Sequence, residues 1–321
     1  MLKIGSYTLN TNIFLAPLSG CSDIPFRLIS REHGARFCFY EMVDANSIVR
    51  DRPGTYRLLK KHEDDSPIAA QLLGQDPAIM FDAAQKIIEI TGTPFLDINC
   101  ACPAKKVIKK KAGAHLLRDA GMLCGIVKKL ASGLKVPVTA KLRIGFDSID
   151  IPRITKIAAG CEASGAAALF VHGRTMAQGY AGEIDYASIR AIKDAVRIPV
   201  FGIGNILNGK LAKKMFDETL CDGIMVARGS FGNPWIFADI EDYLKNGKLR
   251  SPRPLRTRKS VLKRHLTYID MYKDLTPVIR AGIMRKVSMW YLTGFPAAKR
   301  IRAEISKTRD HAGLLKVIDG I

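Results

Sequence analysis

The 321-residue sequence has no uninterrupted apolar stretch approaching the roughly 18 residues that a membrane helix requires. Its first residues, 1–5, also lack the apolar core of a secretory signal peptide. The seven cysteines are an odd number, without paired Cys-x-x-Cys motifs and without histidines at zinc-ligand spacing. We therefore expect a cytoplasmic protein with no membrane segment, no disulfide framework and no metal site.

Acidic residues are also scarce, with 30 Asp and Glu against 50 Lys and Arg, and the formal net charge is +20. An enzyme that acts only on small neutral metabolites does not need such an excess. Residues 246–321 alone contain 18 Lys and Arg but only 5 Asp and Glu, a net charge of +13. A hydrophobic fraction of 47% excludes a disordered chain, so a folded protein with a polyanionic partner is expected.

Eight short apolar runs recur along the chain, separated mostly by segments in which apolar residues have helical spacing. Continuous hydrophobicity within each run predicts strands buried on both faces, as in a parallel sheet covered by helices. Eight such units predict a (β/α)8 TIM barrel. An open doubly wound sheet is the alternative, but no G-x-G-x-x-G motif follows the first run. The predicted strands are 12–17, 36–41, 67–72, 95–99, 137–143, 167–172, 199–203 and 222–227.

We expect residues 1–245 to form the catalytic barrel and residues 246–321 to form a small basic helical domain. The second region opens with the Pro/Arg-rich segment SPRPLRTRK. One later stripe predicts a buried helix face and consists of Ile279, Ile283, Val287 and Trp290. Lysines and arginines on one module release counterions from a nucleic-acid backbone, so RNA or DNA binding is favoured. A solvated face that only aids solubility is the alternative.

Catalytic groups of a barrel project from the C-terminal ends of its strands, and here those ends are unusually polar. The candidates at or just after strands one to six are Pro17, Gln71, Asn99, Cys102, Lys141, Arg143, His172 and Arg174. After strands seven and eight, small residues can bring backbone amides close to a phosphate. These phosphate-binding candidates are Gly202, Gly204, Asn205, Ala227, Arg228 and Gly229.

Lys141 emerges from an apolar strand, where a lysine is costly to bury unless its ammonium meets an anionic group. Against a flavin ring this ammonium would stabilise the anionic reduced form, with Gln71 at the pyrimidine edge. Cys102 lies in a loop that also carries lysines at 105, 106 and 109–111. Positive charge favours a thiolate nucleophile, whereas a proton donor must remain neutral, so chemistry alone leaves both roles for Cys102 open.

The ordered set of motifs resembles the tRNA-dihydrouridine synthases, FMN-dependent reductases of uridine in RNA, and most closely their bacterial B-type subgroup. The resemblance extends over nearly the whole chain. The motifs are LAPLSGCSDIPFR at 15–27, AAQLLGQDP at 69–77, INCACPAKKV at 98–107, AKLRIGFD at 140–147, VHGRTMAQGYAGEIDY at 171–186, GIGNI at 202–206, ARGSFGNPWIF at 227–237 and MRKVSMWYLTG at 284–294.

This sequence departs from the family pattern at two places. Ala101 replaces the usual Gly before the Cys-Pro pair, which leaves Cys100 and Cys102 as neighbours. The choice of Cys102 rests on the proline that follows it and on its spacing from Asn99. The usual Gly-Asn-Gly after strand seven is Gly-Ile-Gly-Asn at 202–205.

The resemblance implies that hydride passes from flavin N5 to uracil C6 while Cys102, as a general acid, protonates C5. Asn99 would hold the uracil edge, and Arg143 and Arg174 would lie near the substrate. FMN would contact a set of residues made up of Pro17, Gln71, Lys141, His172, Asn205 and Gly229, with its phosphate at Arg228.

The resemblance further implies tRNA as the partner and NADPH or NADH as the reductant of FMN, and we expect a monomer. Two other functions are compatible with the same residues. One is a dihydroorotate-type flavin oxidoreductase that acts on a free pyrimidine, and the other is an RNA-binding module that keeps the barrel as a scaffold.

Overall fold

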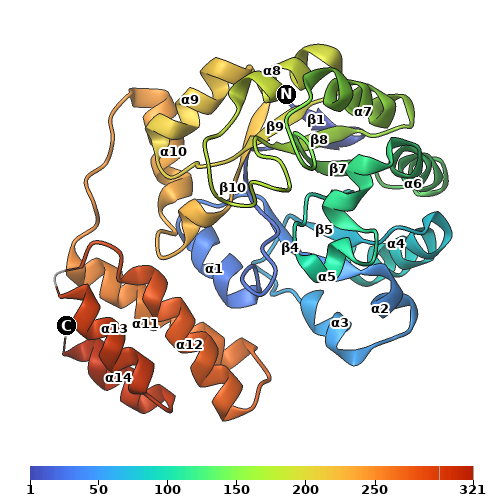
Figure 1. Ribbon diagram of the computed structural model, residues 1–321. Coiled ribbons are helices and arrows are strands. Elements are labelled where there is room, and N and C mark those ends of the chain that lie inside the picture. Colours follow the sequence, from blue (N-terminus) through green and yellow to red (C-terminus); the bar gives the residue numbers. More distant parts are fainter. Residues whose placement is uncertain (296, 321) are drawn as a thin grey trace.

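The computed structural model describes residues 1–295 and 297–320, in which a barrel lies beside a separate group of helices (Figure 1). Eight parallel strands form one sheet in the order β3-β10-β9-β8-β7-β6-β5-β4. A parallel bridge between Phe14 and Phe37 joins the two end strands, and the Leu15 amide donates to the Phe37 carbonyl at 2.9 Å. The predicted (β/α)8 barrel is therefore confirmed.

All eight predicted strands overlap an observed strand. The strands are β3 (Ile13–Leu15), β4 (Cys38–Asp44), β5 (Ile68–Leu73), β6 (Leu96–Cys100), β7 (Val138–Arg143), β8 (Ala168–His172), β9 (Val200–Ile203) and β10 (Gly223–Val226). The largest difference is in β4, which runs to Asp44 through a register shift between Phe39 and Met42. The sequence patterns also gave no sign of a two-stranded hairpin, β1 (Lys3–Ile4) and β2 (Tyr7–Thr8), because such short strands carry no periodicity.

Helices surround the sheet and mostly begin at an acidic residue whose side chain caps the first turn. The Asp76 carboxylate, for example, accepts from the amides of Ala78 and Ile79, both at 2.9 Å. The helical segments of the barrel are α1 (Ile24–Glu32), α2 (Ala45–Val49), α3 (Pro53–Leu58), α4 (Pro77–Thr91), α5 (Lys105–Ile108), η1 (Gly113–Arg118), α6 (Ala120–Gly133), α7 (Ile151–Ala163), α8 (Tyr186–Ala195), α9 (Gly209–Thr219), η2 (Arg228–Ser230) and α10 (Ile236–Asn246).

Phenylalanine rings fill the interior of the barrel near the N-terminal ends of its strands. Phe14 stacks on Phe37 with a centroid distance of 4.5 Å and on Phe201 at 4.9 Å, and Phe170 stacks on Phe201 at 4.7 Å. All of these rings are fully buried, and Ile4 of the N-terminal hairpin joins the same cluster. This apolar floor leaves only the C-terminal end of the barrel available for polar groups.

The C-terminal region is helical and packs against α1. Its helices are α11 (Leu255–Tyr272), α12 (Pro277–Tyr291), α13 (Ala298–Lys307) and α14 (His311–Asp319), and the predicted boundary at residue 245 falls at the end of α10. Trp290 of α12 stacks on Phe231 of the barrel at 4.4 Å and 7°. The ion pairs of Arg264 with Glu32, at 2.8 Å, and of Lys273 with Asp23 connect α11 to α1.

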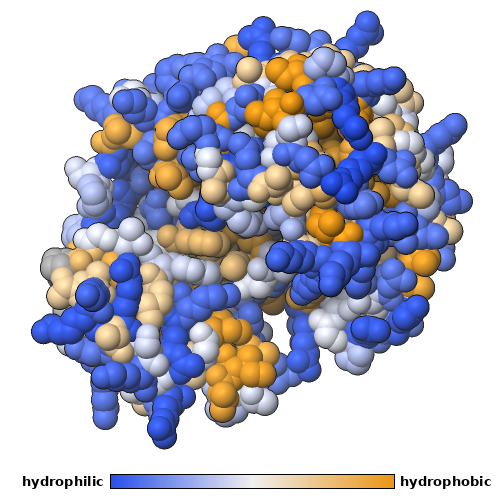
Figure 2. Space-filling model, viewed as in Figure 1, coloured by the Kyte–Doolittle hydropathy of each residue, from blue (hydrophilic) through white to orange (hydrophobic). Residues whose placement is uncertain are grey.

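The predicted apolar stripe on α12 is only partly correct. Val287 is buried, but the side chain of Ile279 is 53% exposed, and the buried face runs instead through Met284, Ser288 and Tyr291. Helix α12 packs on the barrel and on the other C-terminal helices at once, which rotates its buried face away from the predicted line. Exposed apolar side chains therefore lie at the α11–α12 turn, and Figure 2 shows apolar surface on this part of the helical group.

A buried ion triad fastens α1 to the loop before β5. The Asp65 carboxylate is fully buried and pairs with the guanidinium groups of Arg27, at 2.7 Å, and Arg31, at 2.8 Å. These side chains are only 1% and 11% exposed, so neither guanidinium can be fully hydrated without Asp65.

We expect Asp65→Ala to lower the free energy of unfolding by about 3–5 kcal/mol, since it leaves a buried charge uncompensated. Urea denaturation measures this directly. The neighbouring Asp64, whose side chain is 80% exposed, supplies the matched control, and Asp64→Ala should change stability by less than about 0.5 kcal/mol. Equal effects of the two substitutions would contradict the assigned role of the triad.

Candidate active site

A cavity of about 350 Å³ opens at the C-terminal ends of the strands. Its volume lies in the range of small-molecule pockets, roughly 300–1,000 Å³. Most of the predicted site residues line it, namely Pro17, Gln71, Asn99, Cys102, Lys141, Arg143, His172, Gly204, Asn205, Ala227, Arg228 and Gly229. Gly202 and Arg174 were predicted with them but do not line this cavity.

The structure distinguishes the two neighbouring cysteines at the end of β6. Cys100 is fully buried among the apolar residues between sheet and helices, whereas the half-buried Cys102 lines the cavity. The Asn99 side-chain oxygen accepts from the amides of Ala101, at 3.1 Å, and Cys102, at 2.9 Å. Asn99 therefore fixes the backbone that carries the Cys102 thiol. Of the two neighbours Cys102 is the one that lines the cavity, as does Cys21 in the loop after β3.

Lys141, on strand β7, lines the cavity. Among the described residues, no acceptor lies within hydrogen-bond distance of its ammonium. Burial and the nearby Arg143 lower the pKa of Lys141, while the negative charge of Asp97 opposes this shift. An ammonium that lacks a partner in such surroundings is suited to an anionic ligand.

His172 lines the same wall and is 7% exposed. Burial, together with the positive charges of Lys141, Arg143 and other arginines, lowers the pKa of His172 to about 2. The imidazole is therefore neutral at any ordinary assay pH. It can donate or accept a hydrogen bond, but it cannot serve as a charged acid there.

Arg143 is 2% exposed and is largely occupied by backbone carbonyls. Its guanidinium donates to the carbonyl oxygens of Ala101, at 2.7 Å, Thr175, at 2.8 Å, and Gly179, at 2.9 Å. It thus ties the loop of Cys102 to the loop after β8. The structure therefore gives Arg143 a bracing function at the cavity wall, and its place near a substrate stays a prediction.

The loops after β9 and β10 form a cradle at one end of the cavity. Gly204 has φ +142° and Asn205 has φ +46°, backbone conformations that turn the chain sharply behind β9. The Arg174 guanidinium donates to the Asn205 side-chain oxygen at 3.1 Å, so Arg174 supports the cradle from outside. A Cβ on Gly202 would approach the Met215 sulfur at 2.6 Å, which places this glycine against α9 rather than in the cradle.

Sequence reasoning missed several residues of this region, among them Cys21 and Tyr180 in the cavity lining and Asp97 below it. Tyr180, in the loop after β8, is 59% exposed, lines the cavity and lies under the guanidinium of Arg228 at 4.9 Å. Its position in a long loop offered no sequence signal. Asp97 is fully buried just below the cavity. A carboxylate inside the apolar run FLDIN was an available signal, by the same argument that singled out Lys141.

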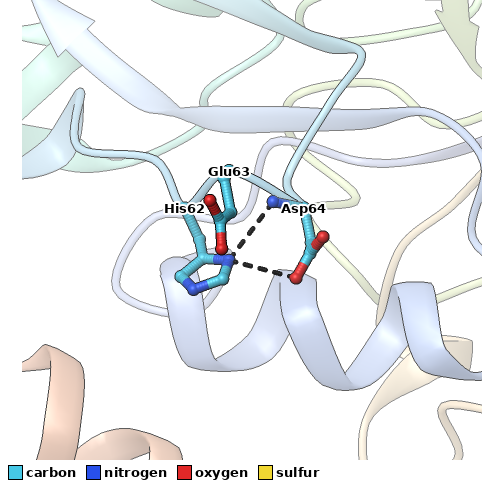
Figure 3. A group of neighbouring side chains, drawn as sticks. All are labelled: His62, Glu63 and Asp64. Atoms are coloured by element: carbon cyan, nitrogen blue, oxygen red, sulfur yellow. Dashed lines mark hydrogen bonds and ion pairs between the residues drawn. The ribbon is translucent and has the colours of Figure 1, made fainter.

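A group of possible metal ligands lies elsewhere, in the loop before β5, and consists of His62, Glu63 and Asp64 (Figure 3). His62 Nδ1 accepts a hydrogen bond from the Asp64 amide at 3.2 Å, so the lone pair that faces the carboxylates is already used. Glu63 and Asp64 are exposed. The three residues do not line the cavity, and nothing about their geometry assigns them a ligand.

The fold and the position of the site place the protein among (β/α)8-barrel enzymes. Two solved structures of similar fold are a morphinone reductase mutant in complex with tetrahydroNAD and a histamine dehydrogenase from Rhizobium. The first is 14% identical, with a TM-score of 0.53 over 79% of this chain and 92% of its own. The second is 13% identical, with a TM-score of 0.58 over 83% of this chain and 50% of its own.

The sequence comparisons are far more specific. The dihydrouridine synthase family model matches residues 14–319. The tRNA-dihydrouridine synthase B of Pseudomonas aeruginosa is 39% identical over 97% of this chain and 92% of its own. A probable tRNA-dihydrouridine synthase of Rickettsia bellii is 35% identical over 97% of this chain and 94% of its own. The protein belongs to the dihydrouridine synthase family, whose members are flavin-dependent oxidoreductases.

No helix of the described chain is both long enough and apolar enough to cross a membrane. Lys141 is predicted to contact the flavin, and its ammonium has no hydrogen-bond acceptor among the described residues.

We expect Lys141→Met to weaken flavin affinity by about 10- to 100-fold, the loss of one charged hydrogen bond. Titration of flavin into the flavin-free protein measures the dissociation constant. Lys129, on the outer helix α6 with its ammonium over the Phe81 ring at 4.9 Å, provides the control substitution Lys129→Met. Unchanged affinity in Lys141→Met would show that the ammonium does not contact the flavin.

Proposed function

We propose that the protein reduces a uridine of tRNA to 5,6-dihydrouridine, with FMN as cofactor and NADPH or NADH as reductant. The observation that carries this proposal is the meeting of the Cys102 thiol, the Lys141 ammonium and the Gln71 amide in one cavity at the barrel mouth. These are a proton donor, a cation and a hydrogen-bonding edge. The names of the relatives support the same reaction.

The residues present fit FMN. The Gln71 amide has one N–H and one oxygen lone pair left after its two internal hydrogen bonds, which suits the alternating donors and acceptors of a flavin pyrimidine. The Lys141 ammonium would stabilise the anionic reduced ring. The cradle of Gly204, Asn205, Arg228 and Gly229 would hold the phosphate, with His172 as a neutral hydrogen-bonding partner.

Bound FMN would supply hydride from N5 to uracil C6, and NADPH or NADH would restore the reduced form. The Cys102 thiol would then deliver its proton to C5 as a general acid. Asn99 would hold Cys102 in reach through the two backbone amides, and its second N–H, which donates to the Met42 sulfur at 3.3 Å in the structure, would turn to the uracil edge. Tyr180 would offer an exposed ring at the rim on which a base can stack.

A barrel pocket cannot reach a base that remains stacked in folded RNA, so the target must be extruded and its backbone held nearby. The C-terminal helices supply cations for this task. Several of these cations, including Arg264 and Lys273, pair with acidic residues of the barrel. Others on α13 are exposed and form no ion pair with the described residues, namely Lys299, Arg302 and Lys307.

A dihydroorotate-type oxidoreductase of a free pyrimidine would use the same cavity and cofactor. It would not need the additional charge of +13 on the C-terminal region. A binding module that keeps a barrel only as a scaffold would explain that charge, but it would not need a thiol and an ammonium in one cavity. The uridine reductase is the function that uses both features.

We predict that Cys102→Ala lowers the single-turnover rate of uridine reduction by about 100- to 10,000-fold, the usual contribution of a positioned proton donor. Dihydrouridine is quantified in tRNA after reaction with the prereduced enzyme. Cys100→Ala is the matched control, because the Cys100 side chain points away from the cavity and its loss should cost only packing. A Cys102→Ala enzyme with the wild-type rate would eliminate the thiol as the acid.

We also predict that tRNA affinity falls steeply with salt and that a triple variant Lys299→Ala, Arg302→Ala, Lys307→Ala has a shallower salt dependence. The slope of log affinity against log salt should drop by about one for each phosphate that the variant no longer neutralises. The control is a triple variant of ion-paired cations on the barrel helices, Arg190→Ala, Lys213→Ala, Lys214→Ala. Identical slopes for the two triple variants would contradict RNA binding at α13.

A further inference from the structure

Asp97 lies beneath the cavity without lining it, and its carboxylate connects three strands. Gln71 of β5, Asp97 of β6 and Thr139 of β7 are in register across the sheet. The Gln71 side-chain N–H donates to Asp97 at 2.7 Å, and the Thr139 hydroxyl donates to the other carboxylate oxygen at 2.6 Å. This layer sits directly above the phenylalanine floor.

Both oxygens of the fully buried Asp97 carboxyl accept a hydrogen bond, so the group faces both neighbours as an acceptor. Burial raises the pKa of Asp97 to about 6, and the hydrogen bonds from Gln71 and Thr139, with the positive charge of Lys141, oppose a larger rise. An ionised carboxylate only accepts hydrogen bonds. Its presence next to Gln71 therefore determines which end of that amide faces it.

This constraint passes along a chain of side chains. Because Gln71 must donate to Asp97, its oxygen is the atom left to face Asn99, and it accepts from the Asn99 N–H at 2.7 Å. The Asn99 oxygen is then turned toward the amides of Ala101 and Cys102, from which it accepts. Backbone amides can only donate, so both ends of the chain demand the same polarity.

We propose that Asp97 is a positioning residue of the reductase site, because its carboxylate fixes the orientation of the Gln71 and Asn99 amides and thereby the loop that carries Cys102. The hydrogen-bond chain follows from the structure alone, whereas its importance for uridine reduction rests on the proposed function. Asp97 itself touches neither the cavity nor a reacting atom.

The decisive substitution is Asp97→Asn, which keeps the shape but allows position 97 either to donate or to accept. The orientation of the Gln71 and Asn99 amides is then set from the backbone end of the chain alone, so the acceptor for the Cys102 loop is less firmly held. We expect iodoacetamide to alkylate Cys102 about 3- to 10-fold faster in the flavin-free full-length variant, the factor that corresponds to one lost buried hydrogen bond. Peptide mass spectrometry follows Cys102, with Cys124 on α6 as the internal reference.

Two further variants separate polarity from simple damage to the structure. Thr139→Val removes one hydrogen bond to Asp97 but leaves the amide chain intact, so its Cys102 rate should remain that of the wild type. The double variant Asp97→Asn, Gln71→Glu moves the carboxylate by one position. The carboxylate at position 71 would accept from both neighbours and again force Asn99 to donate to it, so alkylation of Cys102 should return to the wild-type rate.

Faster alkylation in Asp97→Asn with recovery in the double variant would establish the positioning role. A Cys102 rate that is unchanged in Asp97→Asn, or raised equally in Thr139→Val, would overturn it. Should Asp97→Asn fail to fold, Gln71→Met breaks the same chain without touching Asp97, and an unchanged Cys102 rate in that variant would likewise overturn the proposal. Alkylation requires neither flavin nor RNA, so a wild-type protein that failed to reduce uridine would refute the proposed function separately.

Discussion

One constraint determines the structure of the site. The polar side chains at the barrel mouth lie above buried phenylalanine rings, so they must form their hydrogen bonds with one another. Phenylalanine rings fill the interior below, so the Asp97 carboxylate faces apolar side chains on that side. It is satisfied instead by Gln71 and Thr139 from the flanking strands. The same low-polarity surroundings leave Lys141 short of a partner and keep His172 neutral.

Acidic and basic side chains are distributed unevenly between the barrel and the C-terminal helices. Acidic residues of the barrel are used as helix caps, as at Asp76, or as ion-pair partners, as at Asp65. Some of the C-terminal cations bind such acidic residues and hold α11 against α1, whereas the exposed cations of α13 have no such partner among the described residues. The exposed cations therefore lie on the part of the chain that packs against the barrel, and not in the lining of the cavity.

Most of the architecture could be predicted from the sequence, because parallel strands buried on both faces leave continuous apolar runs at regular spacing. The polar residues at the strand ends could be predicted in the same way, and Gln71, Lys141 and His172, which line the cavity, are examples. The sequence pattern alone could not show which way individual side chains point. It did not show that Cys100 faces outward while Cys102 faces the cavity, that Arg143 is occupied by backbone carbonyls, or that α12 buries Met284 in place of Ile279. Each of these depends on contacts between distant segments.

The central claim is that the Cys102 thiol gives a proton to uracil C5 while hydride arrives at C6 from the flavin. Turnover in ordinary water with NADPH that carries deuterium at the transferred position tests it most directly when the product is read by NMR or mass spectrometry. The thiol proton comes from the solvent, so the account predicts hydrogen at C5 in every product molecule and deuterium, diluted by exchange of the flavin N5 hydrogen, at C6 only. Deuterium at C5 would contradict it.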